Sequence, residues 1–511
     1  MPTVDIDTDE LRELTGHDEK SDADLRADLF ELGLEYEGET DEGELRFEFE
    51  PDRLDRLSVE GVARSLRYQY GDDRGVYVPK TNDADWTIRV EDVPDERPYV
   101  TGAIVRGLDL DDAALDSLIQ LQEKLHATMG RKRAKGAIGV HDLTMLKGGE
   151  ASDDGEGKSI RYTGIDRDGE EFVPLEGDTA MTPAEVLSEH HIGTAYADLV
   201  ADYHSVPAIY DSIGLFSFPP VVNGRRTEVS TESRDLFIEM TGTDQWTIDH
   251  MLNVVCYALD ARGGTIEDVR VEYEDAPGEY GAELVRPDFS TKTKTVAHDR
   301  IERTLGIDLE ESDVIDLLER SGLDGEGTEN DGEPAYDVTI PPYRVDVLHP
   351  VDVIDDVGRA YGFNELEPRY PEVRTIGGRH ERARLEEAVR TSLVGLGFQD
   401  LLNFHLTSAE ELHDRMGLDS GTEVLGGGDP VEIRNPYSED YTVVRTWLLP
   451  SLVQVLENNT HRRYPQDLAE VGFVAERDDE VNTGVAEARH VAGALARHDV
   501  SYEDAKARLQ A

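Results

Sequence analysis

Four aspartates between residues 339 and 364 lie close enough in sequence to bind one metal ion. Asp346 follows a predicted strand, whereas Asp352, Asp355 and Asp356 share one face at the start of a predicted helix. The cluster offers only oxygen ligands, which suits a hard cation. Mg²⁺ suits it best, because a few carboxylates and several waters complete its octahedral shell. The sequence does not separate Mg²⁺ from Mn²⁺.

The same aspartates also have a purely structural explanation. Aspartate is favoured in the first turn of a helix, where it caps free N–H groups and meets the positive end of the helix dipole. The chain is also so acidic that carboxylates cluster by chance. Spacing alone leaves both explanations open.

Two further groups of residues could bind phosphate or a metal ion. Residues 131–136, Arg-Lys-Arg-Ala-Lys-Gly, are the densest basic segment, which could contact phosphate groups or form a solvated loop. The pair His190 and His191 could bind a metal with a third ligand, but none is indicated. Cys256, the single cysteine, excludes an internal disulfide and is expected in an apolar helix core.

Acidic residues outnumber basic ones by 111 to 51 among 511 residues, which gives a net charge of −60. In molar salt the Debye length falls to about 3 Å, so this self-repulsion is largely screened. The composition therefore indicates adaptation to a salt-rich cytoplasm. It disfavours ordinary nucleic-acid binding, so such contacts would need local Arg/Lys islands. The chain has no apolar run of membrane-spanning length and no signal pattern, which predicts a cytoplasmic protein.

The pattern of predicted helices and strands along the chain indicates an α+β, multidomain fold. We expect a small α/β unit at 1–85, a mixed α/β domain at 86–285, a metal-carrying domain at 286–366 and a last module at 381–511. A strand at 336–340 would place Asp346 beside the helix that carries the other three aspartates. The Gly- and acid-rich residues 324–334 predict an exposed loop, and 366–380 predict a linker.

Three long motifs resemble the beta-subunit family of phenylalanine–tRNA ligase, of the archaeal/eukaryotic type. The first contains Pro341, Arg344, the four aspartates, and then Ala-Tyr-Gly-Phe-Asn at 360–364. The second is Asp-Arg-Leu-Asp-Arg-Leu-Ser-Val-Glu-Gly-Val-Ala-Arg at 52–64, where Asp52 replaces the usual Asn. The third begins Asn-Pro-Tyr-Ser and covers 435–452. The resemblance covers essentially the whole chain, in the family's order.

This resemblance implies a subunit of a heterotetramer of two alpha and two beta chains. The ligase joins L-phenylalanine to tRNA(Phe), converting ATP to AMP and diphosphate. The alpha subunit would bind ATP and L-phenylalanine, so no catalytic residue for aminoacylation is expected here. The resemblance further implies Mg²⁺ at the four aspartates, in a winged-helix-like domain. Residues 381–511 would form an inactive, C-terminally incomplete module with the antiparallel sheet and helices of class II synthetases.

The resemblance also implies that residues 86–285 form an editing domain, which hydrolyses tRNA charged with the wrong amino acid, chiefly tyrosine. Small hydroxyls and an amide could orient a water for this ester hydrolysis, and no Ser-His-Asp set is evident. The candidate editing residues are Ser217, Asn223, Thr231, Glu232 and Asp244. The alternative is a β-rich core with polar turns, in which Asn223 and Gly224 make a hairpin turn.

A protein of another class remains as a rival interpretation. This would be a stand-alone editing hydrolase, or a tRNA-binding scaffold, that never joins a ligase. A free editor needs no module of the class II type, so that module argues against the rival. A large apolar face on the module, unmatched within the chain, would predict an obligate partner.

Overall fold

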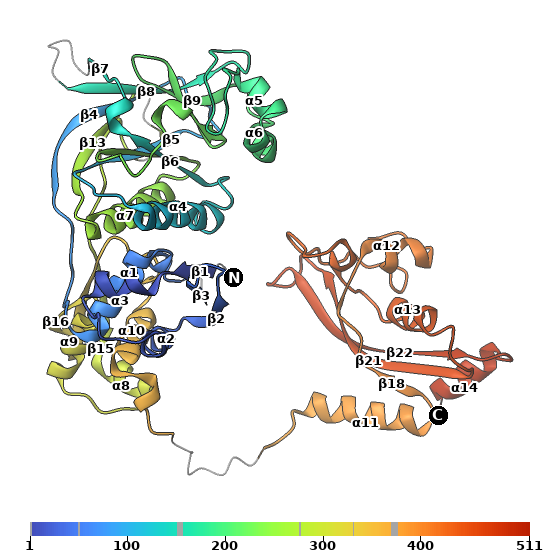
Figure 1. Cartoon of the computed structure of the whole chain (residues 1–511). Helices are drawn as coiled ribbons and strands as arrows, with labels where there is room; N and C mark the ends of the chain where they lie inside the picture. Colours follow the sequence, from blue (N-terminus) through green and yellow to red (C-terminus); the bar gives the residue numbers. More distant parts are fainter. Residues whose placement is uncertain are drawn as a thin grey trace. The chain divides into compact units, whose positions relative to one another are not determined.

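Figure 1 shows the computed structural model of the chain, which describes residues 3–49, 52–150, 157–274, 277–278, 280–330, 332–368 and 377–510. The chain divides into two compact units, of which unit 1 ends at Pro368 and unit 2 follows it. The division falls within the predicted linker 366–380, although 369–376 lie outside the described residues. The α+β, multidomain fold class is confirmed. The finer division into four domains stays a prediction.

Unit 1 begins with a small sheet in the order β1-β3-β2, which packs with three helices. Its elements are β1 (Thr3–Ile6), α1 (Thr8–Thr15), α2 (Asp22–Glu31), β2 (Glu35–Glu39), β3 (Leu45–Glu48) and α3 (Val59–Tyr70). Local sequence sets the helix ends. Asp7 caps α1, the Ser21–Asp24 capping box begins α2, and Ser58 caps α3.

The central part of unit 1 is one large sheet with the strand order β11-β10-β9-β8-β4-β13-β5-β12-β6, to which β7 and β14 add at the sides. The pairs β4–β13 and β4–β8 are parallel, and the other pairs are antiparallel. Its strands are β4 (Thr81–Glu91), β5 (Tyr99–Arg106), β6 (Gly136–Asp142), β7 (Gly149–Glu150), β8 (Lys158–Ile165), β9 (Val206–Tyr210), β10 (Leu215–Phe218), β11 (Val222–Asn223), β12 (Leu236–Gly242), β13 (Thr265–Tyr273) and β14 (Glu283–Arg286).

Helices α4 (Asp112–Ala127) and α7 (Gln245–Ala261) cover one face of this sheet, where α7 packs on β5 and β12 (Figure 1). The shorter α5 (Pro183–Glu189) and α6 (His191–Tyr196) lie near β9. As predicted, Cys256 is fully buried in α7, and this burial raises the pKa of its thiol.

The last part of unit 1 has three helices and an antiparallel sheet in the order β15-β17-β16. Its elements are β15 (Lys292–Ala297), α8 (His298–Leu305), α9 (Glu311–Glu319), β16 (Asp324–Asn330), β17 (Glu333–Ile340) and α10 (Pro350–Tyr361). The predicted exposed loop at 324–334 is wrong, since β16 pairs with β17 there. The strand is largely exposed and held by backbone pairing, so its acidic composition resembles that of a loop.

Unit 2 contains a sheet in the order β18-β21-β22 and a small pair of strands, β19 and β20. Its elements are α11 (Glu381–Gly395), β18 (Gln399–Leu401), β19 (Leu406–Thr407), α12 (Ala409–Leu412), β20 (Val443–Val444), α13 (Leu449–Asn458), β21 (Gln466–Arg477), β22 (Val485–Ala496) and α14 (Tyr502–Gln510). The sheet is mixed and not wholly antiparallel as predicted, because β18 runs parallel to β21. No helix in the described part of the chain is both long and apolar enough to cross a membrane.

Candidate functional site

The four aspartates predicted to bind a metal lie at the junction of β17 and α10, but Arg344 holds two of them. Its guanidinium Nη2 lies 2.6 Å from an oxygen of Asp346 and 2.6 Å from an oxygen of Asp356. The Arg344 side chain is only 1% exposed, so these ion pairs are buried. Burial would raise the pKa of Asp346, but Arg344 beside it lowers that pKa below its usual value.

The other two aspartates make bonds of their own. Asp352 accepts hydrogen bonds from the backbone N–H groups of Leu348 and His349 at 2.8 and 2.6 Å, which begins α10 with a capping box. Asp355 accepts a hydrogen bond from Arg359 on the helix surface at 2.7 Å. As placed, the four carboxylates therefore do not fit a magnesium ion, because two face a buried guanidinium and a third caps the helix.

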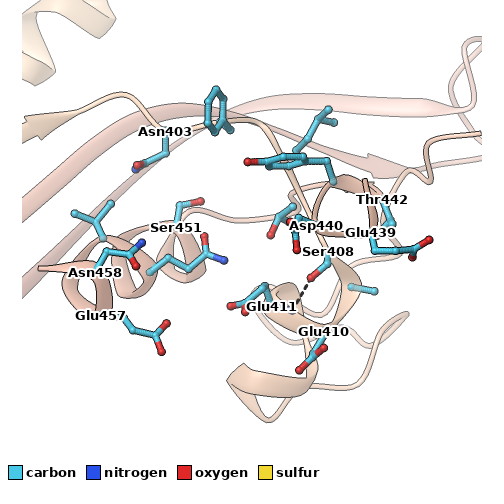
Figure 2. Close-up of a pocket in the computed structure, with 17 residues that line it drawn as sticks. Asn403, Ser408, Glu410, Glu411, Glu439, Asp440, Thr442, Ser451, Glu457 and Asn458 are labelled. Atoms are coloured by element: carbon cyan, nitrogen blue, oxygen red, sulfur yellow. Dashed lines mark hydrogen bonds between the residues drawn. The ribbon is translucent and has the colours of Figure 1, made fainter. Parts of the chain in front are cut away.

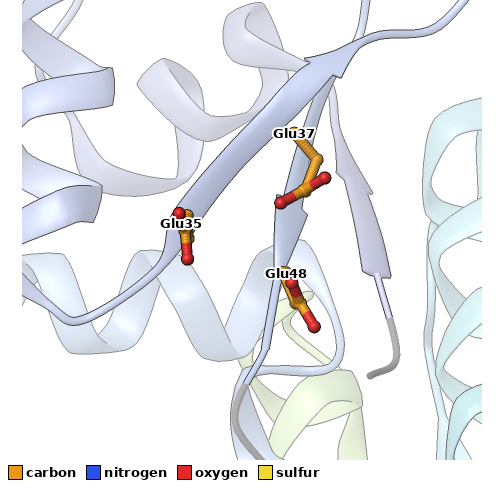
Figure 3. A group of neighbouring side chains, drawn as sticks. All are labelled: Glu35, Glu37 and Glu48. Atoms are coloured by element: carbon orange, nitrogen blue, oxygen red, sulfur yellow. The ribbon is translucent and has the colours of Figure 1, made fainter. Parts of the chain in front are cut away.

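A different group of carboxylates does converge, on the first sheet. Within the described ranges, the one set of three acidic, histidine or cysteine side chains with ligand atoms within 4.8 Å is Glu35, Glu37 and Glu48 (Figure 3). Glu35 and Glu48 face each other across β2 and β3. Like charges at such a position destabilise a sheet in dilute salt, and screening in molar salt removes much of that cost.

The candidate editing residues Ser217 and Asn223 do come together. They are directly paired across β10 and β11, and the Ser217 Oγ lies 3.1 Å from Asn223 Oδ1. Ser217 also donates a hydrogen bond of 2.8 Å to Glu239 Oε1 on β12. Since β10 and β12 lie toward opposite ends of the strand order, this bond joins the two ends of the curled sheet. Asn223 and Glu239 line a cavity of about 80 Å³ at that place.

Glu239 lines the cavity and was not among the residues singled out from the sequence. Its side chain is 1% exposed, and its Oε2 has no hydrogen-bond partner among the described residues. His141, which is anchored by Thr227 at 2.8 Å, lies 3.7 Å from Glu239 Oε1. Gly139 leaves room for this carboxylate, because a Cβ there would lie 2.3 Å from Oε1. The available signal was a carboxylate in the middle of the apolar strand Leu236–Gly242.

Of the five editing candidates, only Asn223 is part of the cavity lining. Ser217 is fully buried next to Asn223, and the other three lie elsewhere. Glu232 is exposed and Thr231 is half-buried, in the turn that precedes β12. Asp244 caps α7, because it accepts hydrogen bonds from the backbone N–H and the hydroxyl of Thr247 at 3.0 and 2.5 Å. Five polar residues near one another in sequence were expected at one pocket, but strand alternation and helix capping place these three elsewhere.

One residue of the basic segment 131–136, Arg133, lines the same cavity. Arg133 lies over the Tyr196 ring at 4.1 Å and donates to the carbonyl of Val221 at 2.8 Å, whereas Arg131 and Lys132 are exposed. All three have left-handed backbones, with φ of 47°, 53° and 70°. Such conformations cost on the order of 1–3 kcal/mol each and gather at functional sites.

Two buried side chains stabilise this strained segment. Arg97, which is fully buried, donates to the carbonyls of Arg133 and Ala134 at 3.1 and 3.3 Å, and to Thr241 on β12. His126 accepts from the backbone N–H of Ile138 at 2.8 Å. Burial and the nearby arginines lower the pKa of His126 to about 3, so it stays neutral at physiological pH. Near neutral pH, His126 therefore helps to position the backbone and does not transfer protons.

A cavity of about 800 Å³ in unit 2 lies between α12, α13, β19 and residues 439–442 (Figure 2). Its described lining includes five carboxylates and no arginine or lysine: Glu410, Glu411, Glu439, Asp440 and Glu457. Phosphate groups need cationic or N–H donors. This lining therefore disfavours a nucleoside triphosphate.

Two protein families match parts of this chain. The family described as tRNA synthetase B5 domain matches residues 294–363, called the B5 segment below. The family described as phenylalanyl tRNA synthetase beta chain CLM domain matches residues 366–511.

Known proteins match over the whole length. The phenylalanine–tRNA ligase beta subunits of Haloarcula marismortui and Halorubrum lacusprofundi are each 68% identical to this chain, over 100% of it and 89% of their own length. That of Thermococcus gammatolerans is 36% identical, over 99% of this chain and 87% of its own. A solved N-terminal fragment of the phenylalanyl-tRNA synthetase beta subunit from Pyrococcus horikoshii has a TM-score of 0.63 and 32% identity, covering 70% of this chain and 99% of the fragment.

Proposed function

This chain belongs to the family of phenylalanine–tRNA ligase beta subunits and is thus a subunit of an aminoacyl-tRNA ligase. We propose that it supports the reaction that an alpha subunit carries out and that it hydrolyses wrongly charged tRNA. The reaction joins L-phenylalanine to tRNA(Phe) in the cytoplasm, and ATP yields AMP and diphosphate. Two alpha and two beta chains would form the enzyme. The alpha subunit would bind ATP and L-phenylalanine. The cavity of about 800 Å³ in unit 2 supports this assignment, because its acidic lining disfavours ATP.

The surface of unit 2 is the observation that carries the subunit role. Among the residues that the structure describes, more than half of the exposed large apolar side chains lie in this unit, although it contains little more than a quarter of the chain. The most exposed include Leu402 at 81%, Phe404 at 77%, Leu425 at 74% and Tyr437 at 105%. An apolar surface of this kind in so acidic a protein is typical of an interface with a partner. A stand-alone hydrolase has no use for it.

The cavity lined by Asn223 and Glu239 supports an editing role. A tyrosyl group differs from a phenylalanyl group by one hydroxyl, and the free Oε2 of Glu239 is an acceptor for that hydroxyl. Binding the hydroxyl would satisfy a buried carboxylate oxygen, whereas phenylalanine would leave it unsatisfied. Ser217 fixes this carboxylate through its hydrogen bond, and Asn223, which lines the cavity, can orient a water toward the ester. The cavity of about 80 Å³ must widen to admit a tyrosyl side chain.

The entrance to that pocket is the proposed contact for the tRNA. Arg131 and Lys132 are exposed next to Arg133, which lines the cavity. Two cations beside an ester-binding pocket would neutralise phosphates near the 3′ end of the charged tRNA. In molar salt such contacts are weakened, so this local island would position the tRNA more than it would add affinity.

Magnesium at Asp346, Asp352, Asp355 and Asp356 remains a prediction from the resemblance, and it needs Arg344 to release two carboxylates. For the chain alone in 3 M KCl, we expect 10 mM MgCl₂ to change the unfolding temperature by less than about 1 °C. Differential scanning calorimetry would measure this. A rise of several degrees that Asp355→Asn abolishes would show that magnesium binds at this group of aspartates.

The subunit role is tested by aminoacylation of tRNA(Phe) with phenylalanine in molar KCl. A version of this chain with the full length of its relatives would be assayed alone, with the alpha subunit of the same genome, and beside the alpha subunit alone. We expect product only in the mixture. Absence of activity in the mixture, with hydrolysis of tyrosyl-tRNA still present in this chain, would favour the stand-alone editor.

A further inference from the structure

Asp346 and Asp356 of the B5 segment belong to a larger set of buried charges that also includes residues of the second motif. Arg64 lies over the ring of Tyr343 at 4.3 Å, and Arg53 is electrostatically coupled to Arg344 and Asp346. The set therefore joins the segment around α3 to the segment around α10. Residues far apart in the sequence thus share one buried interface inside unit 1.

In this set the arginines outnumber the carboxylates. Its four guanidinium groups belong to Arg53, Arg56, Arg64 and Arg344, and its three carboxylates belong to Asp55, Asp346 and Asp356. Asp55 pairs with Arg53 at 2.8 Å and with Arg64 at 3.3 Å, and Arg344 pairs with the other two carboxylates. One positive charge is left without a partner.

That unpaired charge is on Arg56, which is only 5% exposed. It makes none of the ion pairs found in the described part of the chain, and donates instead to Ser65 Oγ at 3.0 Å and to the carbonyl of Leu32 at 2.9 Å. Burial and the nearby Arg53 lower the pKa of Arg56 to about 9, which still leaves the guanidinium charged at neutral pH. A buried charge without a counter-charge is costly.

A cavity of about 40 Å³ lies beside Arg56. Its lining also includes Arg53, Arg320 and Arg359, as well as the hydroxyl of Ser65 and the amide of Gln69. Asp356 and Glu31 are the carboxylates of the lining, so cations outnumber anions there by four to two. A water molecule takes about 30 Å³, so the space suits one small ion and excludes a nucleotide.

We propose that this cavity binds a chloride ion, which supplies the missing counter-charge of Arg56 and holds the α3 segment against the B5 segment. Chloride is the anion that a salt-adapted chain meets at molar concentration, so even a weak site would be filled. An anion site would thus lie next to the aspartates that the sequence predicts to bind a cation, because the buried guanidinium groups outnumber the buried carboxylates.

Bromide is the direct probe of this site. Crystals of the full chain soaked in molar KBr should give an anomalous peak within hydrogen-bonding reach of the Arg56 guanidinium. Crystals of Arg56→Gln, which keeps a polar side chain without the charge, should lack the peak. A water molecule at this position in wild-type crystals, with no anomalous signal, would overturn the proposal.

The solution test compares thermal unfolding in 3 M KCl and in 3 M potassium glutamate, whose anion is too large for the cavity. The change of anion also alters general hydration, so the wild-type shift is read against Arg56→Gln and Arg56→Lys. When chloride is replaced by glutamate, we expect the unfolding temperature of the wild type and of Arg56→Lys to fall by about 3 °C more than that of Arg56→Gln. Arg303→Gln, which removes an arginine 71% exposed on α8, should respond like the wild type. Equal shifts in wild type and Arg56→Gln would refute chloride binding.

Discussion

Glu239→Ala is expected to slow hydrolysis of tyrosyl-tRNA(Phe) by about 100-fold or more, while phenylalanylation by the assembled enzyme stays unchanged. Removal of the carboxylate takes away the acceptor of the tyrosyl hydroxyl, and it frees Ser217, which donates to Glu239 at 2.8 Å. The measurement is the rate of deacylation of pre-charged tRNA at saturating and at limiting substrate. The loss should be much larger for tyrosyl-tRNA than for phenylalanyl-tRNA, because only the former uses Glu239 Oε2.

Two matched variants separate this role from a structural one. Glu232→Ala removes an exposed carboxylate outside the cavity, so its editing rate should equal that of the wild type. Gly139→Ala keeps Glu239 but adds a Cβ where the carboxylate lies, so it should reduce editing in the same selective way. If Glu239→Ala lost tyrosyl and phenylalanyl hydrolysis equally, or edited normally, the carboxylate would have no part in recognising the hydroxyl.

Glu470→Leu is expected to destabilise unit 2 by about 3–5 kcal/mol, because it leaves the charge of Arg445 buried and unpaired. Their side chains are 0% and 1% exposed, and Arg445 Nη2 lies 2.7 Å from Glu470 Oε1. Asn403 also donates to Glu470, and Arg445 donates to the carbonyl of Phe473, so the pair is fully bonded. Calorimetry of the full chain in 3 M KCl should show the transition of unit 2 falling by about 10 °C or more.

The matched controls are a double variant and an exposed pair. Arg445→Leu with Glu470→Leu removes both charges and should recover most of the lost stability. Arg477→Leu breaks a pair with Asp429 whose side chains are 59% and 53% exposed, so the transition should move by about 1–2 °C at most. A loss below about 1 kcal/mol in Glu470→Leu would mean that water reaches Arg445, contrary to its burial.

The sequence predicted the structure well where apolar residues have helical spacing, as around Cys256 inside α7. Two of the predicted editing residues, Ser217 and Asn223, lie in contact. Glu239 was missed because it becomes part of the cavity beside Asn223 only when the two ends of the large sheet meet. The aspartates were predicted to share one helix face, but Asp355 is half exposed whereas Asp356 is buried. Spacing along one helix also does not reveal that Arg344 reaches two of the carboxylates. Long-range contacts of this kind depend on tertiary packing.

The buried charges between α3 and α10 also bear on how this chain folds while it is made. Residues 56 and 356 are 300 positions apart. A ribosome adds about 5–20 residues per second, so roughly 15–60 s pass between synthesis of Arg56 and of Asp356. During that time the surface that α3 later buries, with its arginines, faces solvent, so the N-terminal sheet has to survive as a partly packed intermediate. High internal salt, which screens the surrounding carboxylates, would help the nascent chain through this interval.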